Sequence, residues 1–317
     1  MNYEKLINAA DSTLISPRKL ERVLVLLKEG PKKQIDVQRE LGVPTSAIKY
    51  ISQELGDIVL KEGDKLSLKD DSLTLVAGIH SHRSATDAEF EKNIELALPE
   101  LQAIEKSRQR SYRDFDQFRA LPESTVEKVR LMFYRGDVEG RKIILVGDND
   151  LASVALGLSR LAKKITVLDL DKNVLNQIKD ASMKNSLDVE VINYDVKREL
   201  PQELASIYSA AVTDPPYTPQ GIKLFASRAL KGIGKNSGTI YLNYGYSPRS
   251  KERALVVQDG LTKMGLVIEE VRPDFTKYFG AQSIGCSSSL YICRATPMSK
   301  PLVRGNFSGD IYTKAGK

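Results

Sequence analysis

The residues best placed to do chemistry form the run Gly147-Asp148-Asn149-Asp150, which directly follows the strand-like segment Lys142–Val146. In nucleotide-binding α/β domains this position usually carries a glycine-rich loop, whose bare backbone N–H groups bind an anion. Here the loop offers two carboxylates instead. Such a loop is expected to repel an anion and attract a cation, which indicates an unusual ligand.

Further acids follow the next three predicted strands. Asp169 and Asp171 come after the second strand, Asp195 stands before Val196 after the third, and Asp214 ends the fourth. An acid about 20 residues beyond the first loop suits a ribose diol, because a carboxylate can accept from both hydroxyls. An acid after the third strand can accept from an adenine amino group. A single one of these acids could equally be a helix N-cap. The series in register indicates an adenosine nucleoside and resembles class I S-adenosylmethionine-dependent methyltransferases.

The sharpest motif is Asp214-Pro215-Pro216-Tyr217, after the fourth strand. Two prolines fix the backbone and remove two N–H donors, so the turn is rigid. Asp214 and nearby carbonyls can then face a substrate amine, and Tyr217 can cover it. Amino-group methyltransferases that act on adenine use this device. The alternative is a proline-rich turn with a purely structural role.

The acidic loop and this motif must suit the same ligand. S-adenosylmethionine normally places its carboxylate against the first loop, where Asp148 and Asp150 would oppose it by on the order of several kcal/mol. Decarboxylated S-adenosylmethionine lacks that carboxylate, keeps its ammonium, and would fit. On these motifs the chain resembles the branched-chain polyamine synthase family, N4-bis(aminopropyl)spermidine synthase, of thermophilic archaea and bacteria. That family carries an acidic Gly-Asp-Asp-Asp loop, and the departure here is Asn149 in place of the middle acid.

The resemblance implies an aminopropyltransferase. It would transfer aminopropyl groups from decarboxylated S-adenosylmethionine to the secondary amine of spermidine or N4-aminopropylspermidine. The products would be branched-chain polyamines and 5′-methylthioadenosine, and no metal would be required. Asp148 or Asp150 is expected to be the catalytic base, and both are expected to bind the polyamine together with Asp214 and Tyr217. The residues expected to bind the donor are Gly147, Asp169, Asp195, Val196 and Gln117. For Gln117, an ordinary surface loop is an equal alternative to a lid over the nucleoside.

Hydrophobic patterning predicts the elements that position these residues. Strands and helices alternate from residue 141 to residue 296. Strands are expected at 142–146, 164–168, 189–193, 210–213, 238–243, 266–271 and 288–294, with helices at 151–161, 171–185, 221–230 and 251–263. This alternation predicts an α/β fold with a doubly wound, Rossmann-like sheet of the class I methyltransferase type. Ligands of such sheets bind beyond the carboxyl ends of the strands, where the acids lie.

The first 75 residues predict a winged helix-turn-helix domain. The pattern consists of helices at 17–29, at 32–41 and from Pro44, followed by hairpin strands at 58–60 and 65–68. The third helix carries Lys49 alone against Glu54, whereas phosphate contacts need clustered basic residues. A docking or dimerisation module is therefore favoured over a DNA reader.

The remaining boundaries follow from the same patterns. Residues 76–121 are expected to form a connector, with a charged helix at 87–108 and a loop. Residues 122–299 are expected to form the catalytic domain, opening with a helix at 122–134. Residues 300–317, rich in Gly, Ser and Lys, are expected to be a flexible tail.

The amino-acid composition argues against several classes of partner and ligand. Of the 317 residues 28% are charged, the net charge is +6, and both signs are mixed throughout, which favours a solvated surface over a nucleic-acid footprint. Two cysteines and two histidines argue against a disulfide framework and a zinc site. No apolar run approaches the roughly 20 residues that cross a bilayer, and the first residues lack a signal pattern. A cytoplasmic homodimer without membrane or nucleic-acid partners is expected.

Two other function classes remain open. An adenine N6-methyltransferase acting on DNA or RNA would explain the Asp214–Tyr217 motif and the basic charge, but not the acidic loop. A non-enzymatic DNA-binding regulator would leave the motif unused and lacks a basic recognition helix. Salt-dependent DNA binding would favour these classes, whereas stronger stabilisation by the decarboxylated donor than by the intact one would favour the aminopropyltransferase.

Overall fold

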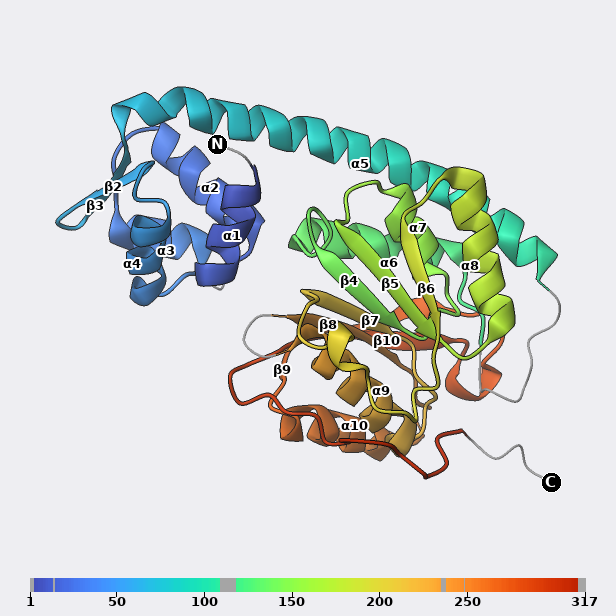
Figure 1. Cartoon of the computed structure of the whole chain (residues 1–317). Coiled ribbons are helices and arrows are strands. Elements are labelled where there is room, and N and C mark those ends of the chain that lie inside the picture. Colours follow the sequence, from blue (N-terminus) through green and yellow to red (C-terminus); the bar gives the residue numbers. More distant parts are fainter. Residues whose placement is uncertain (1–2, 14, 109–117, 235–237, 248, 313–317) are drawn as a thin grey trace. The chain divides into compact units, whose positions relative to one another are not determined.

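The computed structural model describes residues 3–13, 15–108, 118–234, 238–247 and 249–312 (Figure 1). The chain divides into two compact units. One is formed by Met1–Lys92 with Tyr134–Gly136, and the other by Asn93–Phe133 with Asp137–Lys317. Each unit has its own buried apolar core.

The first unit combines short helices with a small antiparallel sheet. Its elements are α1 (Tyr3–Thr13), α2 (Pro17–Lys28), β1 (Lys32–Lys33), α3 (Gln34–Leu41), α4 (Thr45–Glu54), β2 (Val59–Glu62), β3 (Lys65–Leu68) and a 3-10 turn, η1 (Asp70–Ser72). The sheet order is β1-β3-β2. The predicted order of three helices and a hairpin is present, while its classification as a winged helix-turn-helix stays a prediction.

Local sequence explains the boundaries of these elements. Ser16 caps α2 by accepting from the Lys19 backbone N–H, and Pro17 occupies the first turn, where its missing donor has no consequence. Gly42, at φ 61°, ends α3 in the left-handed conformation. The helix expected at 32–41 begins two residues later, because Lys32 and Lys33 pair with β3. The helix α1 was not predicted.

The helix α5 (Leu73–Ser107) is much longer than the one predicted at 87–108. Its first turns contribute Val76 and Ile79 to the core of the first unit, and this burial extends the helix toward the N-terminus. The division between the two units falls within α5, after Lys92.

The second unit is built on a seven-stranded sheet with the order β6-β5-β4-β7-β8-β10-β9. The strands are β4 (Lys142–Val146), β5 (Lys164–Asp169), β6 (Val189–Asn193), β7 (Ala210–Thr213), β8 (Thr239–Tyr244), β9 (Val267–Lys277) and β10 (Ser287–Arg294). The five strands β4 to β8 are parallel, whereas β10 runs antiparallel between β8 and β9. The strand order reverses beside β4, and such a switch point opens a crevice for a ligand.

Helices cover both faces of this sheet. They are α6 (Pro122–Arg135), α7 (Ala152–Leu158), α8 (Lys172–Asn185), α9 (Pro219–Ile233) and α10 (Glu252–Lys263), with short 3-10 turns η3 (Gln202–Leu204) and η4 (Gln282–Ile284). Figure 1 shows α9 and α10 on one face and α7 and α8 on the other. The predicted doubly wound, Rossmann-like sheet is confirmed. In the described ranges, no helix combines the length and apolar character needed to cross a membrane.

Two sequence expectations in this unit need correction. β9 continues to Lys277, past the predicted end at residue 271, because it keeps pairing with β10 as far as Ser287. The chain from 300 to 312 is not a loose tail but is tied to the domain. The Phe307 N–H donates to the Lys197 carbonyl at 2.7 Å, and Ile311 is buried. Residues 313–317 lie outside the described part of the chain.

Candidate active site

A cavity opens at the carboxyl ends of β4, β5 and β7, beside the switch point of the sheet. Five residues predicted from the sequence line it: Gly147, Asp169, Val196, Asp214 and Tyr217. Its walls also carry residues that sequence reasoning did not assign to the site, among them Phe118, Asn149, Tyr194, Phe225, Tyr278 and Tyr312. Asp148, Asp150 and Asp195 lie next to these residues but are not among those that line the cavity. Gln117 lies outside the described residues.

Asp169 holds the cavity in shape at the carboxyl end of β5. One carboxylate oxygen accepts from the Asp148 N–H at 2.9 Å, and the other accepts from the Asp171 N–H at 2.8 Å. Burial raises the pKa of Asp169 above its ordinary value. Each oxygen keeps a lone pair, so the carboxylate can still accept from a ribose hydroxyl.

Gly147 brings the backbone close to this end of the cavity. Its φ of +74° is strained for other residues, and a Cβ there would lie 3.3 Å from a ring carbon of Phe225. The glycine is therefore required by the conformation of the loop as well as by the space.

Asp195 shapes the next loop. Its carboxylate accepts from the Lys197 N–H at 2.9 Å, which turns the chain and leaves Val196 on the cavity wall. The carbonyls of Val196 and Lys197 in turn accept from the buried guanidinium of Arg228 on α9, at 3.0 and 3.4 Å. A contact between Asp195 and an adenine stays a prediction.

Asp148 points away from the cavity and caps the start of α7. It is 1% exposed, and it accepts from the Ser153 N–H at 3.3 Å and from the Ser153 hydroxyl. Burial, and after it the neighbouring charge of Asp150, raises the pKa of Asp148 well above its ordinary value. Asp148 therefore holds a proton more tightly than a carboxyl in water does.

Asp150 forms a buried ion pair with a residue that sequence reasoning missed. Lys128 Nζ on α6 donates to its carboxylate at 2.5 Å, and Thr125 donates to the Asp150 backbone carbonyl at 2.8 Å. Burial acts to raise the pKa of Asp150, but the charge and the hydrogen bond of Lys128 outweigh it, so the pKa lies below the ordinary value. Lys128 carries no sequence signal beyond its place in an amphipathic helix.

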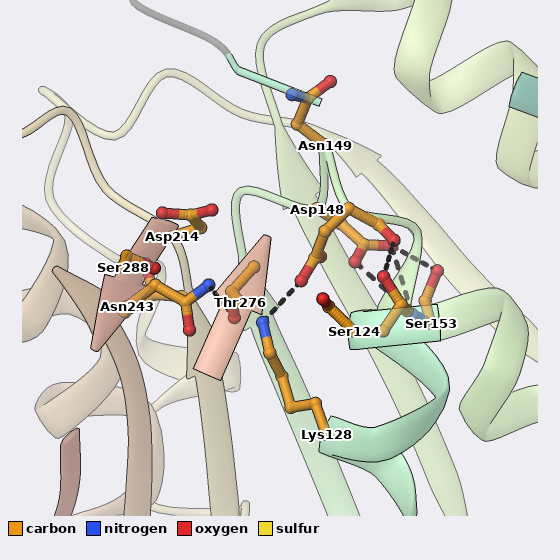
Figure 2. Close-up of polar contacts among 12 residues, drawn as sticks. Ser124, Lys128, Asp148, Asn149, Ser153, Asp214, Asn243, Thr276 and Ser288 are labelled. Atoms are coloured by element: carbon orange, nitrogen blue, oxygen red, sulfur yellow. Dashed lines mark hydrogen bonds and ion pairs between the residues drawn. The ribbon is translucent and has the colours of Figure 1, made fainter. Parts of the chain in front are cut away.

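The loop side chains therefore point to three different places. Figure 2 shows Asn149 set apart from the group that contains Asp148, Ser153 and Lys128. Asn149 accepts from Arg108 through its side chain at 3.2 Å and through its backbone carbonyl at 2.8 Å, and it donates to the Phe118 carbonyl at 3.2 Å. Lys128 neutralises the charge of Asp150, so the loop is less negative than its sequence indicates.

Asp214 faces the cavity with both oxygens held. Tyr217 donates to one at 3.0 Å and Tyr278 to the other at 2.8 Å, and the two hydroxyls are themselves 2.7 Å apart. Burial raises the pKa of Asp214 to about 6, although Lys128 and the two tyrosines act to lower it. Asp214 is therefore a carboxylate at neutral pH, next to the space that a ligand can enter.

Tyr278 connects Asp214 to a polar group deeper in the sheet. Its hydroxyl lies 2.8 Å from that of Ser288 and accepts from the Asn243 amide at 3.2 Å. The same amide donates to Thr276 at 3.1 Å, and the Asn243 Oδ1 atom has no hydrogen-bond partner among the described residues. Figure 2 shows Asn243, Thr276 and Ser288 grouped beside Asp214. These contacts leave Tyr278 with its proton directed at Asp214.

Aromatic side chains continue outward from this point. Tyr217 meets Tyr244 edge-on with ring centroids 5.6 Å apart, and Tyr244 stacks on Tyr246 at 6.0 Å. Tyr241, in the same strand as Tyr244, is buried and donates to Asp137 at 2.6 Å. The faces of this tyrosine row can attract ammonium groups.

The C-terminal segment completes the site. Arg228 donates to the carbonyls of Val303 at 3.3 Å and Gly305 at 2.7 Å, and Thr218 donates to the Ile311 carbonyl at 2.7 Å. These contacts bring Tyr312 to the cavity wall. Across the part of the chain that the structure describes, no cluster of three or more His, Cys, Asp or Glu side chains has the geometry to hold a metal ion.

A family model described as the branched-chain polyamine synthase A C-terminal domain matches residues 97–300. The chain belongs to this family. The match covers the whole seven-stranded sheet and the helices around it. The resemblance inferred from the acidic loop and the Asp214–Tyr217 motif is thereby confirmed.

Two relatives of this chain differ in sequence identity and in the share of each chain that aligns. An uncharacterized protein of Methanocaldococcus jannaschii, MJ0675, is 38% identical over 62% of this chain, and the chain spans about half of it, 49%. The N(4)-bis(aminopropyl)spermidine synthase of the same organism is 27% identical over 86% of this chain and 81% of that protein.

A solved structure has the same fold. The branched-chain polyamine synthase from Thermus thermophilus, crystallised with N4-aminopropylspermidine and 5′-methylthioadenosine, aligns with a TM-score of 0.63. The alignment covers 99% of this chain and 98% of that one at 22% identity. At this identity the likeness is one of fold.

Proposed function

We propose that this protein is an aminopropyltransferase that makes branched-chain polyamines. It transfers aminopropyl groups from decarboxylated S-adenosylmethionine to the secondary amine of spermidine and releases 5′-methylthioadenosine. Family membership supports this activity, as does the name of the M. jannaschii synthase that aligns with 86% of the chain. The Thermus protein, which shares the fold, binds both N4-aminopropylspermidine and 5′-methylthioadenosine in its crystals.

The observation that carries the proposal is the carboxylate of Asp214 on the cavity wall. Tyr217 and Tyr278 hold its two oxygens, so the charge has a fixed position. A fixed carboxylate beside a row of tyrosines suits an acceptor that is a flexible cation, because it holds an ammonium and reduces the freedom of the chain. Asp214 and Tyr217 would hold the acceptor amine in place.

The donor occupies the other end of the cavity in this proposal. Gly147 lets the backbone approach the nucleoside, Asp169 accepts from the ribose, and the Asp195–Val196 loop lies against the adenine. Asp169 and Val196 line the same cavity as Asp214, which supports a donor and an acceptor in one space. Gln117 is proposed as a further donor contact on the resemblance alone.

The reaction is a single displacement. The lone pair of the secondary amine attacks the carbon next to the sulfonium, the carbon–sulfur bond breaks, and its electrons stay on the sulfur of 5′-methylthioadenosine. The amine proton must leave to a base, because a secondary amine has a pKa near that of lysine, about 10. Asp148 or Asp150 is the proposed base, and Asp214 orients the amine. Because neither acid lines the cavity, the proton would reach it through a bridging water. No step uses a metal.

The assembly and the remaining segments are part of the proposal. We infer a homodimer in the cytoplasm, with the first unit serving docking or dimerisation as a winged helix-turn-helix module. Exposed Leu255 and Val256 on α10 are compatible with an interface between copies. Light scattering on the purified full chain tests the dimer, and a monomer mass at micromolar concentration would refute it.

A mass-spectrometric assay tests the function. The full chain is incubated with spermidine and decarboxylated S-adenosylmethionine, beside a control with S-adenosylmethionine and DNA. Stepwise gain of aminopropyl units with release of 5′-methylthioadenosine is the expected result. Methylated adenine in the control, with spermidine unchanged, would establish an adenine methyltransferase instead.

A matched pair of variants ties that activity to the site. Asp214→Asn should lower aminopropyl transfer by about 10²-fold or more, because the amine loses its fixed counter-charge. Asp259→Asn makes the same change on the exposed face of α10, where Asp259 pairs with Lys263, and should leave transfer unchanged. Equal activity of the two variants would remove Asp214 from the mechanism.

A further inference from the structure

Among the three polar side chains of the loop after β4, the one that reaches the cavity is Asn149. Asp148 turns to Ser153 at the start of α7, and Asp150 turns to Lys128 on α6. Asn149 belongs to the described residues that line the cavity, whereas Asp148 and Asp150 do not. The part of the loop that meets a ligand is therefore uncharged.

Behind Asn149, Asp150 is paired with a cation and Asp148 is turned away from the cavity. The Asp150 carboxylate and the Lys128 ammonium are both buried and lie 2.5 Å apart, so together they carry no net charge. Asp148 is enclosed and held by the Ser153 N–H and hydroxyl. A carboxylate on a ligand would consequently meet less of the repulsion that the amino-acid sequence indicates, because Asp150 is neutralised and Asp148 faces away from the cavity.

Cationic groups lie directly behind Asn149. Arg108 donates to its backbone carbonyl and to its side-chain oxygen, at 2.8 and 3.2 Å. Arg108 shares Glu105 with Arg119, at 3.4 and 2.7 Å, so these two guanidinium groups have one carboxylate between them. The net charge of these three side chains is positive, which favours an anionic ligand group at this wall.

We propose that the donor site also binds intact S-adenosylmethionine, a sulfonium that carries an α-carboxylate, and that Asn149 is the residue that permits it. This inference rests on the proposed function, because it assumes that the cavity is the donor site. The ligand carboxylate would lie beside the Asn149 amide, where a third acid would exclude it. Asn149 is therefore a specificity residue for the donor.

The hydrogen bonds of the Asn149 side chain also favour an amide over a carboxylate at this position. Its Nδ2 donates to the Phe118 carbonyl while its Oδ1 accepts from Arg108, so the side chain joins two segments through opposite roles. A carboxylate could accept from Arg108 but could not donate to Phe118. Asn149→Asp would therefore add a negative charge to the cavity wall and lose one hydrogen bond.

Isothermal titration of the full chain with three ligands tests the inference. The ligands are S-adenosylmethionine, decarboxylated S-adenosylmethionine and 5′-methylthioadenosine, the last of which lacks both the carboxylate and the ammonium. In the wild type, the Kd values of the two sulfonium ligands should lie within about tenfold of each other. In Asn149→Asp, the Kd of S-adenosylmethionine should rise by at least about tenfold relative to the Kd of 5′-methylthioadenosine. The Kd of the decarboxylated ligand should not rise in this way.

Gln177→Glu is the matched control. Gln177 accepts from Arg108 Nε at 2.8 Å, so this variant places a new carboxylate beside the same guanidinium but not on the cavity wall. It should leave the ratio of the two Kd values within about threefold of the wild type. An equal change in both variants would mean that Arg108, and not the wall residue, sets the preference.

Two results would overturn the inference. One is a wild type that binds S-adenosylmethionine at least about 100-fold more weakly than the decarboxylated ligand. The other is an unchanged ratio in Asn149→Asp with 5′-methylthioadenosine binding intact. If Asn149→Asp does not fold, the wild-type ratio alone decides.

Failure of the inference is distinguishable from failure of the proposed function. Aminopropyl transfer to spermidine with weak S-adenosylmethionine binding would refute the inference and leave the function standing. Similar binding of both sulfonium ligands, without any aminopropyl transfer, would support the inference and refute the proposed function.

Discussion

Lys128 Nζ donates a hydrogen bond to the Asp150 carboxylate at 2.5 Å, and neither side chain is more than 8% exposed. The pair ties α6 to the loop after β4, and Thr125 adds a second bond from the same helix to the Asp150 carbonyl. A buried pair of this kind adds little stability compared with apolar residues, but removal of one partner leaves a buried charge.

Lys128→Met should therefore lower the free energy of unfolding by about 3–5 kcal/mol, as measured by urea denaturation. Asp150→Asn in the same chain should recover part of this loss, because the unpaired carboxylate is then gone. Lys263→Met breaks an exposed pair on α10 and should change stability by less than about 1 kcal/mol. A Lys128→Met protein as stable as the wild type would show that the pair does not hold the loop.

The double variant Asp148→Asn, Asp150→Asn tests the proposed base. It should abolish aminopropyl transfer, while binding of 5′-methylthioadenosine, measured by titration, should persist because Gly147 and Asp169 are unchanged. Lys128→Met added to this variant removes the ammonium that the change leaves unpaired, and it separates loss of chemistry from loss of folding. Turnover by either variant would exclude both acids as the base.

The raised pKa of Asp214 predicts that activity depends on pH. Burial raises its pKa to about 6, and the amine is held by the ionised form, so transfer should rise as the pH rises through about 6. Tyr278→Phe removes a donor that favours the ionised form and should move this midpoint to higher pH. Tyr291→Phe, which loses a bond from Gln258, should not move it. Initial rates from pH 5 to 9 measure both midpoints.

The same group predicts a pH dependence of stability with the opposite sign. Its pKa is higher in the folded state than the ordinary 3.8, so the folded state holds the proton more tightly. Between about pH 4 and 6 this group should lower the free energy of unfolding as the pH rises, by on the order of 3 kcal/mol. Denaturation of Asp214→Asn should lack this fall. An unchanged profile in the variant would contradict the elevated pKa.

Arg228 should act as a positioning residue for two parts of the site. It binds the carbonyls of Val196 and Lys197 in the loop after β6 and those of Val303 and Gly305 in the C-terminal segment. Arg228→Met leaves these acceptors without their donor and should lower the free energy of unfolding by about 2–4 kcal/mol. It should also raise the KM for the donor by about tenfold, with a smaller change in kcat.

Lys231→Met is the control on the next turn of α9. It breaks an exposed pair with Glu199 and should leave the KM unchanged. Limited proteolysis after Arg304 should become faster in Arg228→Met and not in the control. A donor KM equal to that of the wild type in Arg228→Met would show that the C-terminal segment does not support the site.

Much of the fold was predictable from the sequence because its signals are local. Two strands have the predicted bounds, Lys142–Val146 and Ala210–Thr213. A β-strand can be predicted from a few consecutive residues. The length of α5 was not predictable in the same way. The first half of α5 is stabilised as a helix because Val76 and Ile79 pack into the core of the first unit.

The sequence by itself determined that acids stand at the carboxyl ends of parallel strands, that Asp214-Pro215-Pro216-Tyr217 forms a rigid turn, and that the chain resembles the polyamine synthase family. Tertiary structure decided which acids meet a ligand. Lys128 neutralises Asp150 from another helix, and Tyr278 reaches Asp214 from 64 residues away. Such partners are not visible in local spacing, because the charge and protonation of a buried carboxylate depend on what the fold packs against it.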